Sequence, residues 1–282
     1  LRTPNSIGSY AALAAIILQA NQNEQHGGQS IPNFDYAMAE GVDKSFRKAL
    51  KRNIEKYNEF AGKKLDIKVP DTLSYGDEKT LKKLNVPEPV IKASNEDVEK
   101  QTFQAMEGFI HNLNTMHSRA GAQVPFTSIN FGTCTLPEGR LVIEAILNAS
   151  IKGVGKLHRT AVFPCSIFQC KTGVNRKPGD PNYDLFKLAL KSTAKRLYPN
   201  YANCDWSGNA GYDPNDPRTY FSTMGCRTAN GWDVNGLGQM KDGRGNICPV
   251  TVIMPTLAMQ AAATYDGVPC GDYERDVIDM FM

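Results

Sequence analysis

The sequence lacks the features that mark metal-binding, membrane-spanning and nucleic-acid-binding proteins. Its seven cysteines include no Cys-x-x-Cys pair and no other spacing typical of a zinc site. The longest apolar run, 11–18, is much shorter than the roughly 18 residues that would indicate a membrane span. A net charge of +3 is too small to indicate nucleic acid, although it would suit an anionic small substrate. We therefore expect no metal, no membrane and no nucleic-acid partner.

The composition and the chain ends indicate a piece of a globular cytoplasmic protein. Hydrophobic residues make up 41% and charged residues 22% of the chain, which are typical globular values. An odd number of scattered cysteines is typical of reduced thiols in the cytoplasm, and no signal-peptide pattern opens the sequence. Because the chain starts at Leu1 without a methionine and stops inside an amphipathic segment, 276–282, we expect a fragment.

The first 124 residues are predicted to be mainly helical. Ser6 is a suitable N-cap for an apolar helix that stops before Gly27-Gly28. A basic helix follows, and Ser94 with Asp97 resembles the capping box of a third. The expected helices are 6–23, 43–68 and 94–121, with an irregular connection over 70–89.

The rest of the chain, 125–282, alternates between strand and helix patterns. Such alternation is typical of an α/β fold in which helices connect the strands of a parallel sheet. The expected elements are a strand over 125–132, a helix over 138–152, a strand over 160–164, a helix from 180, a loop, and a strand over 250–255.

Two loops contain the candidates for binding or chemistry. In the loop 220–232, Cys226 stands between Gly225 and Arg227, whose guanidinium would favour a thiolate or bind an anion. A free cysteine is more often a small buried hydrophobe, and none of the four histidines has the context of a cysteine hydrolase. At 27–30, two glycines either let backbone amides approach a ligand or simply allow a turn. Asn246, 20 residues after Cys226, offers a neutral amide that would hold a hydroxyl or carboxylate.

A set of motifs runs along most of the chain. The motifs are Pro4-Asn5-Ser6-Ile7, Gly27-Gly28-Gln29-Ser30, 126–132, Glu138-Gly139-Arg140-Leu141, 160–164, 180–184, Leu197-Tyr198-Pro199, Met224-Gly225-Cys226-Arg227-Thr228 and 243–255. In order and spacing, from residue 4 to about 260, they resemble one family, the anaerobic, glycyl-radical (class III) ribonucleotide reductases.

The resemblance implies a fold and a reaction. The fold would be part of a ten-stranded α/β barrel of the glycyl-radical enzyme type with a central finger loop. Residues 1–124 would be a region with dimer and effector helices, and 125–282 the barrel portion, in one catalytic domain truncated at both ends. Cys226, at the finger-loop tip, would become a thiyl radical that starts the reduction of ribonucleoside triphosphates to 2′-deoxyribonucleoside triphosphates.

The resemblance also implies roles for further residues. Asn246 would orient formate, the usual reductant, and Thr228 matches a small hydroxyl residue near the same site. Arg227 and two groups of residues would contact substrate or effector: Gly27, Gly28, Gln29 and Ser30 in the first turn, and Asn130 and Gly132 at the strand end. A dithiol reductant involving Cys248 is an alternative to formate.

The implied cofactor and partners lie largely outside this chain. The glycyl radical would be generated by a radical-SAM activating enzyme on a loop that these residues lack, and zinc is expected only in that absent C-terminal region. ATP and deoxynucleotide effectors and a second copy of the chain would be further partners, and the fragment alone would be inactive. The alternatives are another glycyl-radical enzyme of the lyase type and an inactive nucleotide-binding or dimerisation module.

Overall fold

The computed structural model describes residues 2–24, 27–62, 65–118, 121–206, 212–225, 228–230 and 251–264. The chain divides into two compact units, Leu1–Gly245 and Asn246–Met282. Within the second unit the described part consists of a short lead-in and the helix α7 (Met254–Thr264).

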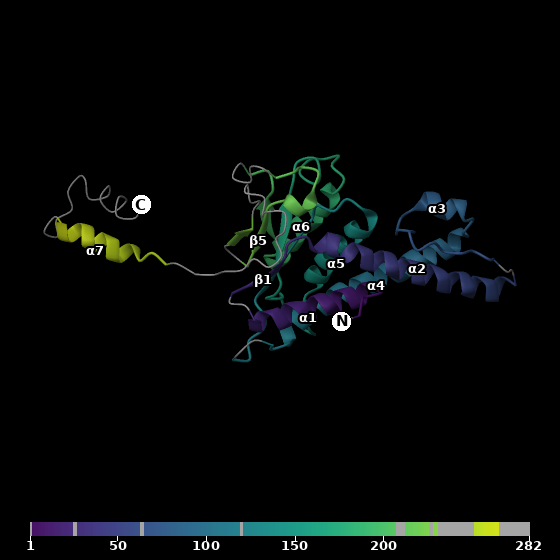
Figure 1. The fold of residues 1–282 in the computed structure, drawn as a ribbon, viewed down its shortest axis with the longest axis horizontal. Helices are drawn as coiled ribbons and strands as arrows, with labels where there is room; N and C mark the ends of the chain where they lie inside the picture. The colour runs from purple at the N-terminus through teal and green to yellow at the C-terminus, as the bar shows by residue number, and fades with distance from the viewer. Residues whose placement is uncertain are drawn as a thin grey trace. The chain divides into compact units, whose positions relative to one another are not determined.

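The first unit combines helices with a four-stranded sheet (Figure 1). The sheet order is β1-β2-β3-β4, and every neighbouring pair is parallel, which confirms the predicted α/β class with crossover helices. A separate antiparallel hairpin consists of β5 and β6. The strands are β1 (Gln29–Ile31), β2 (Thr127–Phe131), β3 (Cys165–Cys170), β4 (Asn200–Asn203), β5 (Ser222–Met224) and β6 (Thr228–Asn230). The helices are α1 (Ile7–Glu24), α2 (Phe34–Ala61), α3 (Glu78–Lys83), α4 (Glu88–Thr115), α5 (Pro137–Lys152) and α6 (Tyr183–Arg196).

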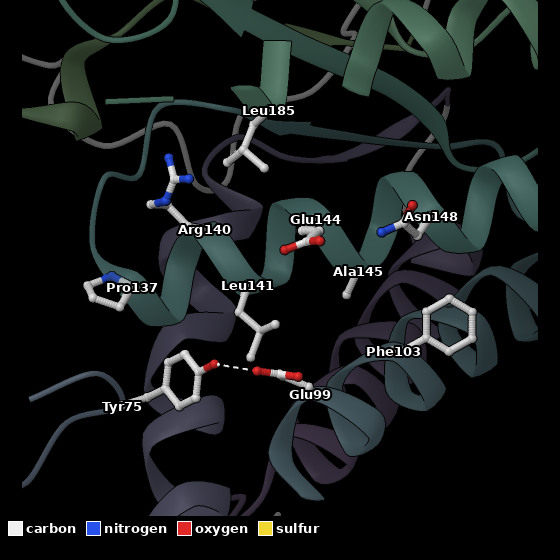
Figure 2. Close-up of a pocket in the computed structure, with 10 residues that line it drawn as sticks. All are labelled: Tyr75, Glu99, Phe103, Pro137, Arg140, Leu141, Glu144, Ala145, Asn148 and Leu185. Carbon is white, nitrogen blue, oxygen red and sulfur yellow. Dashed lines mark hydrogen bonds between the residues drawn. The ribbon is translucent and has the colours of Figure 1, made fainter. Parts of the chain in front are cut away.

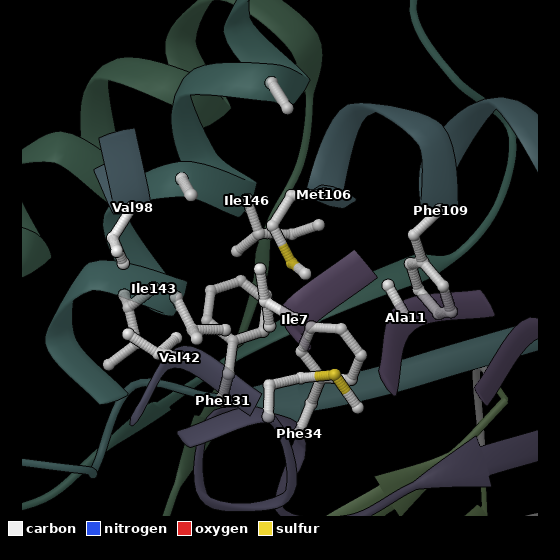
Figure 3. Packing of buried hydrophobic residues seen from close by; sticks show 14 of the residues in the cluster. Ile7, Ala11, Phe34, Val42, Val98, Met106, Phe109, Phe131, Ile143 and Ile146 are labelled. Atoms are coloured by element: carbon white, nitrogen blue, oxygen red, sulfur yellow. The ribbon is translucent and has the colours of Figure 1, made fainter. Parts of the chain in front are cut away.

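The hydrophobic core lies between one face of the sheet and the helices. Figure 3 shows side chains of α1, α2, α4 and α5 converging with Phe131 of β2. The rings of Phe34 and Phe109 lie with centroids 5.1 Å apart, a spacing at which aromatic pairs attract beyond their buried area. Ile129 and Phe131 belong to this core, and alternate strand residues point to opposite faces. Ser128 and Asn130 therefore point to the other face of the sheet, although all of β2 is buried.

Capping explains where the confirmed helices begin. Ser6 accepts a hydrogen bond from the backbone N–H of Ser9 at 3.3 Å, so it acts as the predicted N-cap of α1. Pro137 occupies the first turn of α5 and Gly153 follows its last residue, as helix-end preferences favour.

The boundaries of the other early helices differ from the prediction. Helix α2 starts at Phe34 and ends at Ala61, so it begins well before the basic run. Helix α4 starts at Glu88, and the connection before it contains α3. Ser94 is not a cap: it is buried inside α4, and its hydroxyl donates to the carbonyl of Val90 at 2.7 Å. The polar pattern at 94–97 reflects contacts between helices rather than a helix start.

Two predicted strands are wrong. The strand assigned to 160–164 lies instead at Cys165–Cys170, because the Asn114 side chain already accepts from the backbone N–H groups of Val162 and Phe163, at 2.9 and 3.1 Å. The strand expected over 250–255 is absent from its described part, where Met254 and Pro255 open α7. Proline in a first helical turn loses no hydrogen bond, so it suits that start.

Candidate functional site

The strands of the β5–β6 hairpin lie on either side of the predicted reactive Cys226 in the sequence. Met224 pairs with Thr228 in antiparallel register, and Gly225-Cys226-Arg227 connects them in the sequence. Cys226 and Arg227 lie outside the described residues, as does Asn246. Thr228 is described and half-buried in β6. The structure therefore shows the two strands that lead to and from the predicted cysteine.

Polar side chains of the sheet hold the backbone of the hairpin. Asn130 of β2 accepts from the N–H of Thr223 at 2.9 Å and donates to the carbonyl of Thr223 at 2.8 Å. Ser30 of β1 donates to the same carbonyl at 3.0 Å. Ser128 accepts from the N–H of Gly225 at 3.0 Å. Gly225 directly precedes Cys226, so the sheet fixes the described backbone up to that residue.

A residue of β3 extends this contact to the start of the hairpin. Gln169 is fully buried, and its amide nitrogen donates to the carbonyl of Phe221 at 2.8 Å. The thiol of Cys204 lies 3.5 Å from the same carbonyl. Sequence reasoning missed Gln169 because it placed this strand too early. A single amide within the otherwise small and apolar run Cys165–Cys170 was the available signal.

Gly28 permits a close approach that a side chain would block. A Cβ at this position would lie 2.7 Å from a ring carbon of Phe126 and 3.5 Å from the Cα of Gly225. Gln29 then begins β1, and its side chain accepts a hydrogen bond from Asn21. The turn at 27–30 is thus a packing contact that brings β1 and its Ser30 against the hairpin.

Gly132, at the end of β2, already has partners for both of its backbone groups. Its N–H donates to the Asp35 carboxylate at 2.9 Å, and its carbonyl accepts from Asn175 at 3.0 Å and from Asn182 at 3.1 Å. With a φ of +123° and the Phe168 ring 3.1 Å from a notional Cβ, the position also needs glycine. These contacts give Gly132 a role in ordering the loop after β2.

Comparison with known proteins shows which family the chain belongs to. A model of the family described as anaerobic ribonucleoside-triphosphate reductase matches residues 1–268. The chain belongs to this family. It is 30% identical to the anaerobic ribonucleoside-triphosphate reductase of Escherichia coli (strain K12) over 93% of this chain, and 31% identical to that of Haemophilus influenzae over 93%. The protein of that name from Enterobacteria phage T4 is 32% identical over 93% of this chain.

The chain spans only part of these reductases. It covers 32% of the length of the two bacterial proteins and 38% of the phage protein. The activity of the whole protein therefore remains a proposal for this chain.

One cavity on the helical layer lies apart from the hairpin. It has a volume of about 480 Å³, and Figure 2 shows its lining side chains on α4, α5 and the loop that carries Tyr75. Burial and the nearby Glu99 and Glu144 carboxylates raise the pKa of Tyr75, whose hydroxyl donates to Glu99 at 3.1 Å. None of the residues predicted from the sequence to bind or react lines this cavity, so it is not the site expected from the motifs. The lining residues are Tyr75, Glu99, Phe103, Pro137, Arg140, Leu141, Glu144, Ala145, Asn148 and Leu185.

Arg140 explains one of the family-like motifs in structural terms. Its guanidinium bonds the side chains of Asn182 and Asp184, each at 2.7 Å, and so ties α5 to the start of α6. Burial acts to raise the pKa of Asp184, but the hydrogen bond and charge of Arg140 outweigh it, so this pKa lies below its ordinary value.

The described part of the chain contains neither a candidate metal site nor a candidate membrane span. There, no three or more His, Cys, Asp and Glu side chains are arranged to hold a metal ion. Likewise, no helix within the described ranges is both long and apolar enough to cross a membrane.

Proposed function

We propose that this chain is part of the catalytic subunit of an anaerobic reductase that converts ribonucleoside triphosphates to 2′-deoxyribonucleoside triphosphates. The observation that carries the proposal is the family match over residues 1–268. The relatives are named anaerobic ribonucleoside-triphosphate reductases, and this name indicates the substrate class. The proposal is also supported by the strands that flank Cys226 in the sequence, because the sheet bonds the backbone of the first of them.

The sheet would be part of a ten-stranded barrel, and the β5–β6 hairpin would be its finger loop. Support comes from the chemical character of the face on which the hairpin lies. Ser128, Asn130 and Gln169 are fully buried there and bond the hairpin backbone. Buried hydrogen-bonding groups are costly unless they are paired, so a face of this kind is adapted to an enclosed loop rather than to a hydrophobic layer.

The reaction would begin at Cys226. Its sulfur, as a thiyl radical, would take the 3′ hydrogen of the ribose, after which the 2′ hydroxyl leaves as water. A glycyl radical elsewhere in the complete protein would supply the unpaired electron. Residues of this chain would supply orientation and a dry surrounding. The described side chains that bond the hairpin, including Ser30 and Asn130, are neutral, which fits a site for radical chemistry because they add no ionised group beside it.

Formate would be the reductant, oriented by Asn246, with Thr228 beside the same site. We expect Asn246→Ala in the complete enzyme to weaken the dependence of turnover on formate, because alanine removes the amide that would bond the carboxylate. The measurement is the formate concentration dependence of deoxynucleotide formation. Unchanged formate kinetics would assign the positioning of the reductant to other residues.

Helix α1 is the candidate for contact with a second copy of the chain. Ile16 and Ile17 are 52% and 51% exposed on this apolar helix, and exposed large apolar side chains side by side favour an interface. ATP and deoxynucleotide effectors and a radical-SAM activating enzyme would complete the set of partners.

The proposal predicts the product of the complete enzyme. Activated anaerobically and supplied with formate, it should convert a ribonucleoside triphosphate to the deoxynucleotide, as measured by chromatography. The lyase alternative predicts cleavage of a small carbon substrate with no deoxynucleotide formed. Absence of any ribonucleotide binding in calorimetry would leave only a structural module.

A further inference from the structure

We propose that Asn130 is a positioning residue that fixes the β5–β6 hairpin over the polar face of the sheet, as far as Gly225, the residue directly before Cys226 in the sequence. The inference rests on the proposed function in one respect, the assignment of Cys226 as the reacting thiol. It replaces the expected contact between Asn130 and a nucleotide by a contact with the protein backbone.

The geometry of the Asn130 amide is that of a strand partner. Its oxygen accepts the N–H of Thr223 at 2.9 Å and its nitrogen donates to the carbonyl of the same residue at 2.8 Å. In an antiparallel pair, alternate residues direct both backbone groups away from the partner strand. Asn130 satisfies both groups of Thr223, as a further strand would. Only a primary amide offers a donor and an acceptor at this spacing.

The amide of Asn130 is itself held in place. It is fully buried, and its nitrogen lies 3.3 Å from the hydroxyl of Ser30, which also bonds the carbonyl of Thr223. Ser128, two residues earlier on the same face of β2, accepts the N–H of Gly225. Two adjacent strands thus hold the hairpin at alternate residues, 223 and 225.

These hydrogen bonds fix the backbone from which the chain continues to Cys226. Cys226 follows Gly225 directly, so a shift of the backbone at 223–225 moves the origin of the thiol by a similar amount. For an oriented reaction, a displacement of about 1 Å costs roughly a hundredfold in rate. Thr223 and Gly225 take part in these hydrogen bonds only with backbone atoms, so the sheet positions the hairpin through the hairpin backbone.

The test uses two variants of the complete enzyme, Asn130→Ala and Asn130→Asp. Alanine removes both hydrogen bonds, whereas aspartate in its ionised form keeps the acceptor and loses the donor. We expect faster amide hydrogen exchange in the peptide containing 221–225 for both variants. We also expect kcat to fall by roughly 10- to 100-fold, with KM nearly unchanged and a larger isotope effect when the 3′ hydrogen of the substrate is replaced by deuterium.

A matched control separates positioning from loss of stability. Asn53 is also a buried asparagine, but its amide bonds Ser94 and Asp97 between α2 and α4. Asn53→Ala should lower thermal stability without changing the isotope effect. Exchange at 221–225 that stays at the wild-type rate in both Asn130 variants would overturn the inference, as would an isotope effect that rises equally in Asn53→Ala.

The failure of this inference can be told apart from failure of the proposed function. Hydrogen exchange reports the contact with the hairpin whatever the hairpin does. If Asn130 variants loosen residues 221–225 but leave kcat and the isotope effect at wild-type values, the positioning role is wrong. If a Cys226→Ser enzyme still forms deoxynucleotide, the proposed function is wrong, whereas the exchange result is unaffected.

Discussion

Cys226→Ser is expected to abolish deoxynucleotide formation in the complete enzyme while ribonucleotide binding stays near the wild-type level. A serine O–H bond is much stronger than a thiol S–H bond, so serine cannot carry the radical in place of cysteine, although it fills nearly the same space. The measurements are product formation under anaerobic conditions and calorimetric binding of a ribonucleoside triphosphate. Surviving reduction in the serine variant would refute the role proposed for this residue.

Cys170 offers the matched control for this experiment. It is a free cysteine at the end of β3, and burial raises the pKa of its thiol. Its side chain belongs to the alternate set of β3 residues from Gln169, so it does not share the face that bonds the hairpin. Cys170→Ser should keep deoxynucleotide formation, and comparable losses in the two serine variants would indicate a general effect of removing a thiol.

The α/β class could be predicted from the sequence because it depends on local patterns. Ser6 indicated the start of α1, and the helix predicted over 138–152 agrees closely with α5. The strand 125–132 was recognisable because it is short and ends on a glycine. These signals lie within a few residues of the element that they define.

The errors have a common physical origin in contacts between distant residues. Asn114 takes the backbone N–H groups at 162 and 163 away from the sheet, although 48 residues separate Asn114 from Val162. Ser94, which resembles a cap in sequence, is instead a contact point for Asn53 across two helices. A single sequence contains the residues that make such contacts but not the pairing.

For the candidate site, too, the sequence indicated the residues but not their partners. The resemblance to a family singled out Gly28, Ser30 and Asn130, and the structure brings all three against the hairpin. The nucleotide contacts that the resemblance implies for them stay a prediction. In the structure, Ser30 and Asn130 bond the backbone of Thr223, and Gly28 lies against Phe126 and Gly225. The same residue types serve in ligand binding and in supporting a loop. The two roles therefore look alike in a motif, and the hydrogen-bond partners are needed to tell them apart.

Asp35→Ala is expected to destabilise the fold strongly, because it removes a buried hydrogen-bond acceptor that several backbone groups share. The carboxylate is fully buried at the start of α2 and accepts the N–H groups of Gly132 and Cys134 at 2.9 and 3.0 Å, as well as that of Tyr36. Alanine leaves buried donors without an acceptor, at a cost of roughly 2–4 kcal/mol. The thermal unfolding temperature of the complete protein measures this loss, and Asp35→Asn, which keeps most of the shape and one acceptor, should lose less.

The contribution of Asp35 to the stability of the fold should also depend on pH. Burial raises its pKa above the ordinary value of 3.8, although the backbone N–H groups act to lower it. Between the unfolded and the folded pKa, the folded protein binds more protons, so the contribution of Asp35 to stability falls as the pH rises through this window. The stability of the wild type relative to Asp35→Asn should therefore decrease with rising pH.

Asp184 provides a control in which the stability difference should change with pH in the opposite direction. Its pKa is lowered, because the hydrogen bond and charge of Arg140 outweigh the effect of burial. Its contribution to stability is present above the unfolded pKa and is lost as the pH falls, so the wild type should gain stability relative to Asp184→Asn as the pH rises. A stability difference between the wild type and Asp35→Asn that rises with pH, as expected for Asp184, would contradict the raised pKa of Asp35.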